Sequence, residues 1–138
     1  MAKRILFVED NPDWRLLVGT ALKDAGYEVL SVPGAPEAFL QKNGPAFSLV
    51  ILDLDLGGEN GLMLLQHLKR NHPGAPIILF TCMEHDENAI EHMLKQGAQR
   101  YVRKGITADL VSAVKGLLEP APSRPPEPTE DRSGELLF

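Results

Sequence analysis

The stretch VILDLDLGGENG, residues 50–61, decides the fold. Together with Leu49 it opens on four apolar residues that do not alternate with polar ones. Continuous apolar runs of this length are typical of parallel strands that are covered on both faces. Asp53 follows the run directly, and glycines follow soon after. We therefore predict a buried parallel strand whose carboxyl end carries an acidic side chain.

Other short apolar runs flank this strand in the sequence and also predict buried strands. With the central one, the expected strands are Ile5–Val8, Tyr27–Val32, Leu49–Leu52, Ile77–Phe80, and Tyr101–Val102 with its flanks. Helical patterns separate them, and the first is the clearest. Asn11 is a typical N-cap and Pro12 a typical first-turn residue, while Gly26 supplies the stop. The apolar face expected for this helix comprises Trp14, Leu17, Ala21, Leu22 and Ala25.

Four more helices are expected after the later strands. A short one fits Pro36–Lys42, and apolar spacing marks the others around Leu65, Met93 and Val114. Glycine or Pro-Gly closes the third and fourth helices, at Pro73-Gly74 and Gly97. Five repeats of strand and helix imply crossovers and a parallel sheet. The predicted fold class is α/β: a three-layer α/β/α sandwich with a five-stranded parallel sheet of order 2-1-3-4-5, which is flavodoxin-like.

The length, net charge and cysteine count of the chain argue against several classes of function. The chain has 138 residues and a formal net charge of -5, which argues against direct nucleic-acid or membrane-surface binding. Cys82 is the only cysteine, so an intramolecular disulfide is impossible. The apolar run near the N-terminus is too short for a signal peptide or membrane span, so a cytoplasmic location is expected. We expect one domain over residues 1–119, and a Pro-rich acidic tail or truncated linker over residues 120–138.

Polar residues follow four of the expected strands. The first strand is followed by Glu9 and Asp10, the third by Asp53, the fourth by Thr81 and the fifth by Lys104. Ligands bind at the carboxyl ends of the strands in such sheets, so these side chains should meet. Three crowded carboxylates need a cation among them, and hard oxygen ligands suit Mg²⁺. The set predicts a phosphoryl site with a nucleophile, a metal, a lysine and a hydroxyl.

The chain resembles a bacterial two-component response-regulator receiver domain, of the chemotaxis-type single-domain kind, over residues 3–118. The matching pieces are FVEDNP, VILDLDLGGENG, ILFT and GAQRYVRK. The resemblance implies that Asp53 accepts a phosphoryl group from a sensor histidine kinase or phosphotransfer protein. The other roles that it implies are metal binding by Asp10, Asp53, Glu9 through water and the Asp55 carbonyl, phosphate contact by Lys104, and switching by Thr81 and Tyr101.

By the same resemblance, the fourth helix, fifth strand and fifth helix would form the face that an output protein reads. Such a domain phosphorylates and dephosphorylates itself in a phosphorelay, and is not a turnover enzyme on an external substrate. The chain departs from the family's pattern at three positions, where it has Gly57, Cys82 and Gly105. None of the three removes a reacting group. Cys82 itself is expected to be a small half-buried apolar group.

Two alternatives stay open at this point. Asp53 and Asp55 in the spacing DxD also resemble a haloacid-dehalogenase-type phosphatase, and the fold could serve as an interaction module without phosphorylation. Taken singly, each site residue also has an ordinary structural role, such as a charge at a helix N-terminus for Glu9. The four histidines show no convergent metal-ligand spacing and are expected at the surface; they are His67, His72, His85 and His92.

Overall fold

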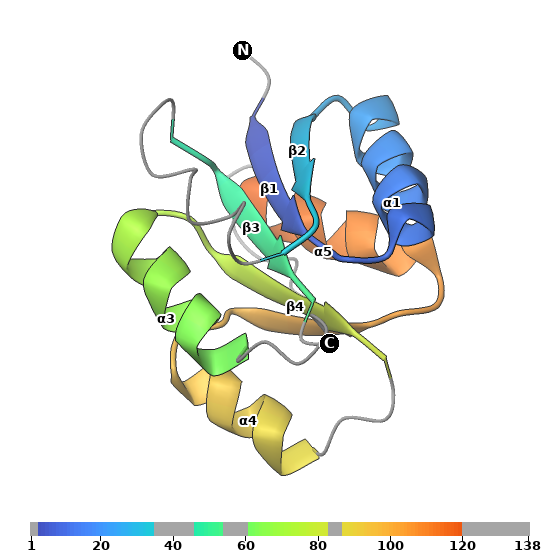
Figure 1. The fold of residues 1–138 in the computed structure, drawn as a ribbon. Helices are drawn as coiled ribbons and strands as arrows, with labels where there is room; N and C mark the ends of the chain where they lie inside the picture. The colour runs from blue at the N-terminus through green and yellow to red at the C-terminus, as the bar shows by residue number, and fades with distance from the viewer. Residues whose placement is uncertain (1–2, 35–45, 54–60, 83–86, 120–138) are drawn as a thin grey trace, which may run out of the picture.

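The computed structural model describes residues 3–34, 46–53, 61–82 and 87–119. Five parallel strands form one sheet in the order β2-β1-β3-β4-β5, as the sequence predicts (Figure 1). The strand order changes direction between β1 and β3, so the carboxyl ends of these two strands form the switch point of the sheet. The strands are β1 Arg4–Val8, β2 Glu28–Val32, β3 Leu49–Leu52, β4 Ile77–Thr81 and β5 Arg100–Arg103.

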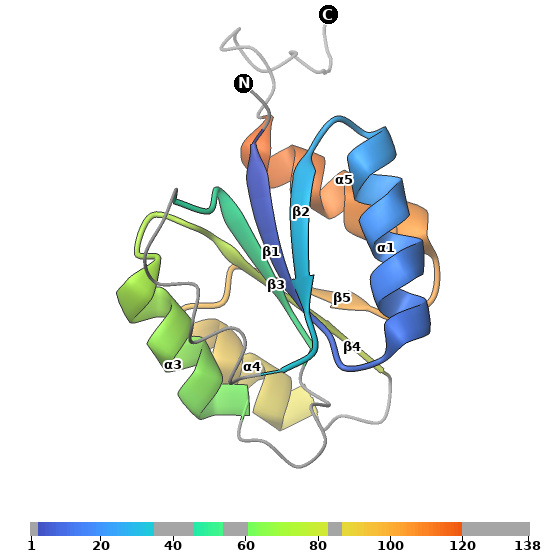
Figure 2. The same cartoon turned by 45° about the horizontal axis from the view of Figure 1, so that its top comes forward.

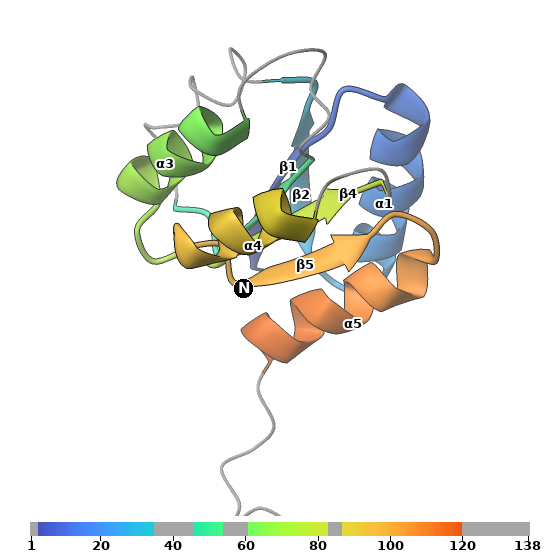
Figure 3. The same ribbon diagram turned by 90° about the horizontal axis from the view of Figure 1, so that it is seen from below.

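Helices cover both faces of the sheet. Figures 2 and 3 show α1 and α5 on one face and α3 and α4 on the other, which confirms the three-layer sandwich. The predicted helix Pro36–Lys42 lies outside the described residues. None of the described helices is long and apolar enough to cross a membrane. The helices with described bounds are α1 Pro12–Asp24, α3 Gly61–Asn71, α4 Glu87–Lys95 and α5 Thr107–Leu118.

The core forms two clusters, one on each face of the sheet. All four residues of β3 are fully buried, and they alternate between the clusters: Leu49 and Ile51 face α1 and α5, while Val50 and Leu52 face α3 and α4. Each fully buried side chain of this size contributes about 1.5–3 kcal/mol. The two edge strands are less buried than predicted. An edge strand has a neighbouring strand on one side only, so part of each edge stays open.

The predicted inner face of α1 needs one correction. Leu17 was expected to face the core, but it is 52% exposed, whereas the next residue, Val18, is fully buried. The inner residues Trp14, Val18 and Leu22 follow each other at intervals of four along the helix. The side chain of Asn11 caps the helix, accepting hydrogen bonds from the backbone N–H groups of residues 13 and 14. The cap prediction is therefore confirmed. Of the predicted inner face, Trp14, Leu22 and Ala25 do pack on the core, and Leu17 was wrong.

His72 also differs from its predicted surface position. Its side chain is buried, and its ring meets the ring of Phe47 edge-on with the centroids 5.4 Å apart. Its backbone N–H donates to the carbonyl of Leu68, 2.8 Å away, which continues the helical hydrogen bonding of α3 by one residue. The imidazole is thus placed at the end of α3, beside Phe47. Local sequence spacing could not reveal this because Phe47 is distant in the chain.

The predicted helix stops are confirmed at two glycines. Gly26 and Gly97 have φ angles of 102° and 122°, in the region that glycine adopts without a steric penalty. At Gly97 a Cβ atom would lie 3.1 Å from the Cε atom of Lys69, so a side chain would also be crowded there. Helix α5 ends at Leu118, and the tail over residues 120–138 lies outside the described residues. The domain boundary at residue 119 therefore stays a prediction.

Candidate functional site

The sheet ladder continues one residue beyond three strands and so fixes the predicted site residues. The backbone N–H of Asp53 donates to the carbonyl of Val8 at 3.0 Å, and that of Glu9 donates to Val32 at 2.9 Å. The N–H of Lys104 donates to the Thr81 carbonyl at 2.8 Å. These main-chain bonds hold the side chains at the carboxyl edge of a rigid sheet, where the sequence predicts them.

Three carboxylates gather at this edge. One oxygen from each of Glu9, Asp10 and Asp53 lies within 4.8 Å of the others. Glu9 and Asp53 are fully buried, while Asp10 is exposed. Crowded acids of this kind repel one another unless a cation lies between them. Because all three donors are hard carboxylate oxygens, the set fits a divalent cation such as Mg²⁺ or Ca²⁺.

Lys104 supplies one positive charge to this cluster. Its Nζ atom lies 2.8 Å from Oε1 of Glu9 and 3.2 Å from Oδ2 of Asp53, and its side chain is 6% exposed. Burial by itself lowers the pKa of a lysine, but the hydrogen bonds and charges of the two acids outweigh it and raise the pKa of Lys104. The ammonium is therefore held in its charged form beside the Asp53 carboxylate.

Lys104 does not fully offset the cost of burying a charge on Glu9. Burial raises the pKa of Glu9 to about 7; Lys104 lowers it, and the charge of Asp53 raises it further. The backbone N–H of Asn11 also donates to Oε2 of Glu9 at 3.2 Å, but this does not offset the burial. A cation bound among these acids would favour the charged form of Glu9 and so lower its pKa.

Three side chains at this site were not predicted as site residues from the sequence. Nζ of Lys104 lies 5.5 Å from the ring centroid of Trp14 and 5.8 Å from that of Phe80. Arg15 donates from Nη1 to the carbonyl of Glu9 at 2.7 Å, which fixes the turn between β1 and α1. The available signal was that Trp14 and Arg15 fall in the first turn of the helix that follows the acidic pair. Only the folded sheet brings Lys104 close to Trp14 and Phe80.

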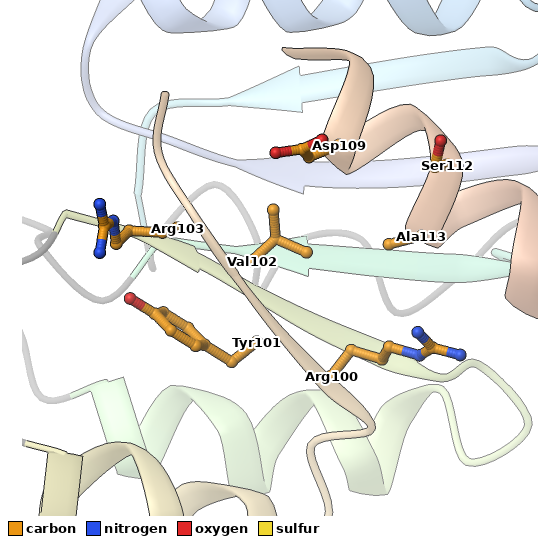
Figure 4. Close-up of a pocket in the computed structure, with 7 residues that line it drawn as sticks. All are labelled: Arg100, Tyr101, Val102, Arg103, Asp109, Ser112 and Ala113. Carbon is orange, nitrogen blue, oxygen red and sulfur yellow. The ribbon is translucent and has the colours of Figure 1, made fainter. Parts of the chain in front are cut away.

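The two predicted switch residues lie on neighbouring strands. Thr81 is fully buried at the end of β4, and Tyr101 is half-buried in β5, packed against the core cluster on the α3 and α4 face. In Figure 4, Tyr101 and Arg103 lie on one side of β5 and Val102 and Arg100 on the other. Cys82 is half-buried, as predicted. Asp55, Gly57 and the imidazole of His85 lie outside the described residues.

Comparison with known proteins identifies this arrangement. A model of the response regulator receiver domain family matches residues 5–115, which is well over half of the chain. The chain belongs to this family. It is a phosphoryl-accepting receiver domain, as the sequence predicts. The family match does not favour the phosphatase alternative that would use Asp53 and Asp55 as its acid pair.

Relatives and solved structures agree on the family. The chain is 33% identical to the sensor protein GacS of Pseudomonas syringae pv. syringae, over 99% of this chain and 16% of that protein. It superposes with a TM-score of 0.73 on the response regulator TrrA from Thermotoga maritima in complex with Mg²⁺–BeF, at 32% identity, over 84% of this chain and 99% of that chain.

A second solved structure is a response regulator from Burkholderia pseudomallei with a phosphorylated aspartic acid, calcium ion and citrate. It matches at 25% identity with a TM-score of 0.74, over 86% of this chain and 67% of that chain. The chain spans about half or less of the length of the first curated relatives that it matches. Output activities of those longer proteins therefore do not transfer to this receiver domain by similarity.

Proposed function

We propose that Asp53 is the phosphoacceptor of this receiver domain. The observation that carries the proposal is the position of its buried carboxylate, at the end of β3, with the ammonium of Lys104 3.2 Å away and two further acids beside it. A nucleophile, a fixed cation and a candidate metal cluster thus share one edge of the sheet. The two matched structures described with a phosphorylated aspartic acid and with Mg²⁺–BeF support this reading.

In the proposed reaction, a carboxylate oxygen of Asp53 attacks the phosphorus of a phosphohistidine. A P–O bond forms as the P–N bond breaks, and the bonding electron pair leaves with the imidazole nitrogen. The product is a mixed anhydride of the aspartate. Lys104 is already charged and desolvated beside the acceptor, so it needs no reorganisation to stabilise the oxygens of the transferring group.

Mg²⁺ is the proposed metal ion. Asp10 and Asp53 would hold it directly, Glu9 would bind through water, and the Asp55 carbonyl would be a further ligand, although Asp55 lies outside the described residues. When bound, the ion would neutralise negative charge on the transferring phosphoryl oxygens. The gathering of three carboxylates, two of them fully buried, supports such a cation.

The proposed signal leaves through Thr81 and Tyr101. A new phosphoryl anion on Asp53 would draw the Thr81 hydroxyl inward, and Tyr101 would turn into the space it vacates. This movement would shift the conformational equilibrium of the face formed by α4, β5 and α5. Part of that face is the hollow of Figure 4, about 400 Å³ in volume. The hollow is lined by Arg100, Tyr101, Val102, Arg103, Asp109, Ser112 and Ala113.

The proposed partners are a sensor histidine kinase or phosphotransfer protein as donor, and an output protein on this face. We propose no direct contact with nucleic acid or membrane, given the net charge of -5. A cytoplasmic location belongs to the same proposal, because ATP-dependent kinases that form phosphohistidine work there. The domain would be a relay component and not an enzyme that turns over an external substrate.

Intact-mass measurement after incubation with Mg²⁺ and a small acyl phosphate tests the proposal. The wild type should gain one phosphoryl group that is lost in acid and in base, and Asp53→Asn should gain none. Asp24→Asn, at the exposed end of α1, is the matched control and should label fully. Labelling that persists in Asp53→Asn would refute the assignment, and chelation of the metal should abolish labelling of the wild type.

A further inference from the structure

The ammonium of Lys104 is close to two acids and to two aromatic rings. Its Nζ atom lies 2.8 and 3.2 Å from carboxylate oxygens of Glu9 and Asp53. The ring centroids of Trp14 and Phe80 are 5.5 and 5.8 Å from the same atom. Both ring distances fall within the range of about 6 Å in which a cation is attracted to a ring face. The rings therefore act on the same atom that contacts the proposed phosphoacceptor.

A lysine side chain needs such a support to hold one position. Its four-carbon stem is flexible, and its ammonium is a compact charge that has no fixed orientation of its own. The acids alone would let Nζ move among several oxygen atoms. The two aromatic rings beside the ammonium occupy space into which Nζ could otherwise move, and they exclude water from the part of the charge that they cover.

Trp14 is itself firmly placed. Its backbone N–H donates to Oδ1 of the N-cap residue Asn11 at 3.2 Å, which ties the first turn of α1 to the loop that carries the acidic pair. Its ring meets Phe80 edge-on, with centroids 5.4 Å apart and an interplanar angle of 84°. Phe80 is fully buried and also contacts Phe7, so it serves the core as well. Trp14 is only half-buried and packs against this core cluster without being one of its buried members.

We propose that Trp14 is a positioning residue for phosphoryl transfer: its indole, backed by Phe80, holds the ammonium of Lys104 against Asp53. The inference rests on the proposed function and adds a residue to it. In this proposal Trp14 acts through Lys104 and not on the metal cluster or the reacting atoms. Indole is the strongest of the natural side chains in this role, because its ring face carries the largest negative potential.

A double-mutant cycle tests the inference. The measured quantity is the initial rate of phosphorylation by a small acyl phosphate with saturating Mg²⁺, followed by intact mass. Trp14→Leu should lower this rate about five- to thirtyfold, the factor that corresponds to about 1–2 kcal/mol at about 1.4 kcal/mol per tenfold. Trp14→Phe keeps a ring face and should recover most of the rate. In the Lys104→Met background, Trp14→Leu should cause no further loss.

The control is Leu16→Ala, on the same helix at a side chain that is 73% exposed, and its rate should equal that of the wild type. Equal fold losses from Trp14→Leu with and without Lys104 would overturn the inference, since Trp14 would then act on the fold alone. Failure of the proposed function would look different, because Asp53→Asn would still be labelled.

Fluorescence gives a second readout if Trp14→Leu does not fold. Trp14 is the only tryptophan, and Lys104→Met removes the charge while keeping a similar length. The emission of Trp14 should change in wavelength or intensity on this substitution, with the far-ultraviolet circular dichroism unchanged. Emission identical to the wild type would show that the ammonium does not bear on the indole, and this outcome would also overturn the inference.

Discussion

A basic side chain lies against aromatic rings at each end of the sheet, and the two arrangements differ in what surrounds the cation. At the carboxyl edge, Lys104 is 6% exposed and shares its charge with two buried acids. At the amino edge, the guanidinium of Arg4 lies 4.4 Å from the ring centroid of Phe47, but its side chain is 28% exposed. Its acidic partner, Glu28, is mostly exposed and 3.6 Å away.

The pKa values of titratable groups at the two edges also shift in opposite directions, and burial is the main cause of both shifts. Burial raises the pKa of Glu9 to about 7 at the carboxyl edge. Burial, followed by the charge of His67, lowers the pKa of His72 at the amino edge. In each case the neutral form is favoured, because a buried charge loses its hydration. The carboxyl ends of the strands therefore keep buried charge beyond what stability alone favours, while the amino ends avoid it.

Removing each cation in turn should give the largest contrast. In metal-free protein at pH 8, Lys104→Met leaves two buried acids without their partner, and we expect a loss of about 3–5 kcal/mol in the free energy of unfolding. Arg4→Met breaks a partly exposed pair and a ring contact, and should cost about 0.5–1 kcal/mol. Urea unfolding measures both, and equal losses would show that burial does not distinguish the two edges.

The pH dependence of stability should sharpen the contrast at the carboxyl edge. Because the folded-state pKa of Glu9 is raised from 4.5 to about 7, its contribution is fully present below about pH 4.5 and is lost as the pH rises through about 7. Between pH 5 and 8 the metal-free protein should therefore lose up to about 3 kcal/mol from this group. Glu9→Gln should reduce this loss of stability with rising pH, as measured in thermal melts, and added Mg²⁺ should reduce it too. A slope that survives in Glu9→Gln would assign it to another group.

The amino edge should show the smallest effect, with the opposite sign. Because the folded-state pKa of His72 is lowered from 6.5, its contribution is present above about pH 6.5 and is lost as the pH falls below that value. His72→Leu removes a buried imidazole whose Nε2 has no hydrogen-bond partner among the described residues, and it should remove this loss of stability at low pH. The exposed His92 is the control, and His92→Gln should leave this loss unchanged.

The rate of phosphorylation should also respond differently to substitutions at the two edges. The His72→Leu variant should label with phosphate at the wild-type rate, because its ring lies at the amino end of the strands, away from Asp53. A changed labelling rate would mean that the two edges communicate through the sheet.

Much of the fold could be predicted because its signals are local. Unbroken apolar runs such as Leu49–Leu52 predict buried parallel strands, and a capping residue such as Asn11 predicts a helix start. Errors arose where the outcome depended on distant packing. Leu17 and Val18 are both apolar neighbours on one helix, and only the docking of α1 on the sheet exposes the first and buries the second.

The order of residues along the chain was enough to predict which chemical groups this protein offers and at which strand ends they lie, because each polar site residue follows an apolar run. Glu9, Asp10, Asp53, Thr81 and Lys104 could all be predicted in this way. Their partners could not: Lys104 contacts Glu9 and Asp53 and lies over the rings of Trp14 and Phe80. Charge pairing, ring contact and burial depend on distances between strands and helices that are far apart in the sequence, and such distances exist only after the sheet has formed.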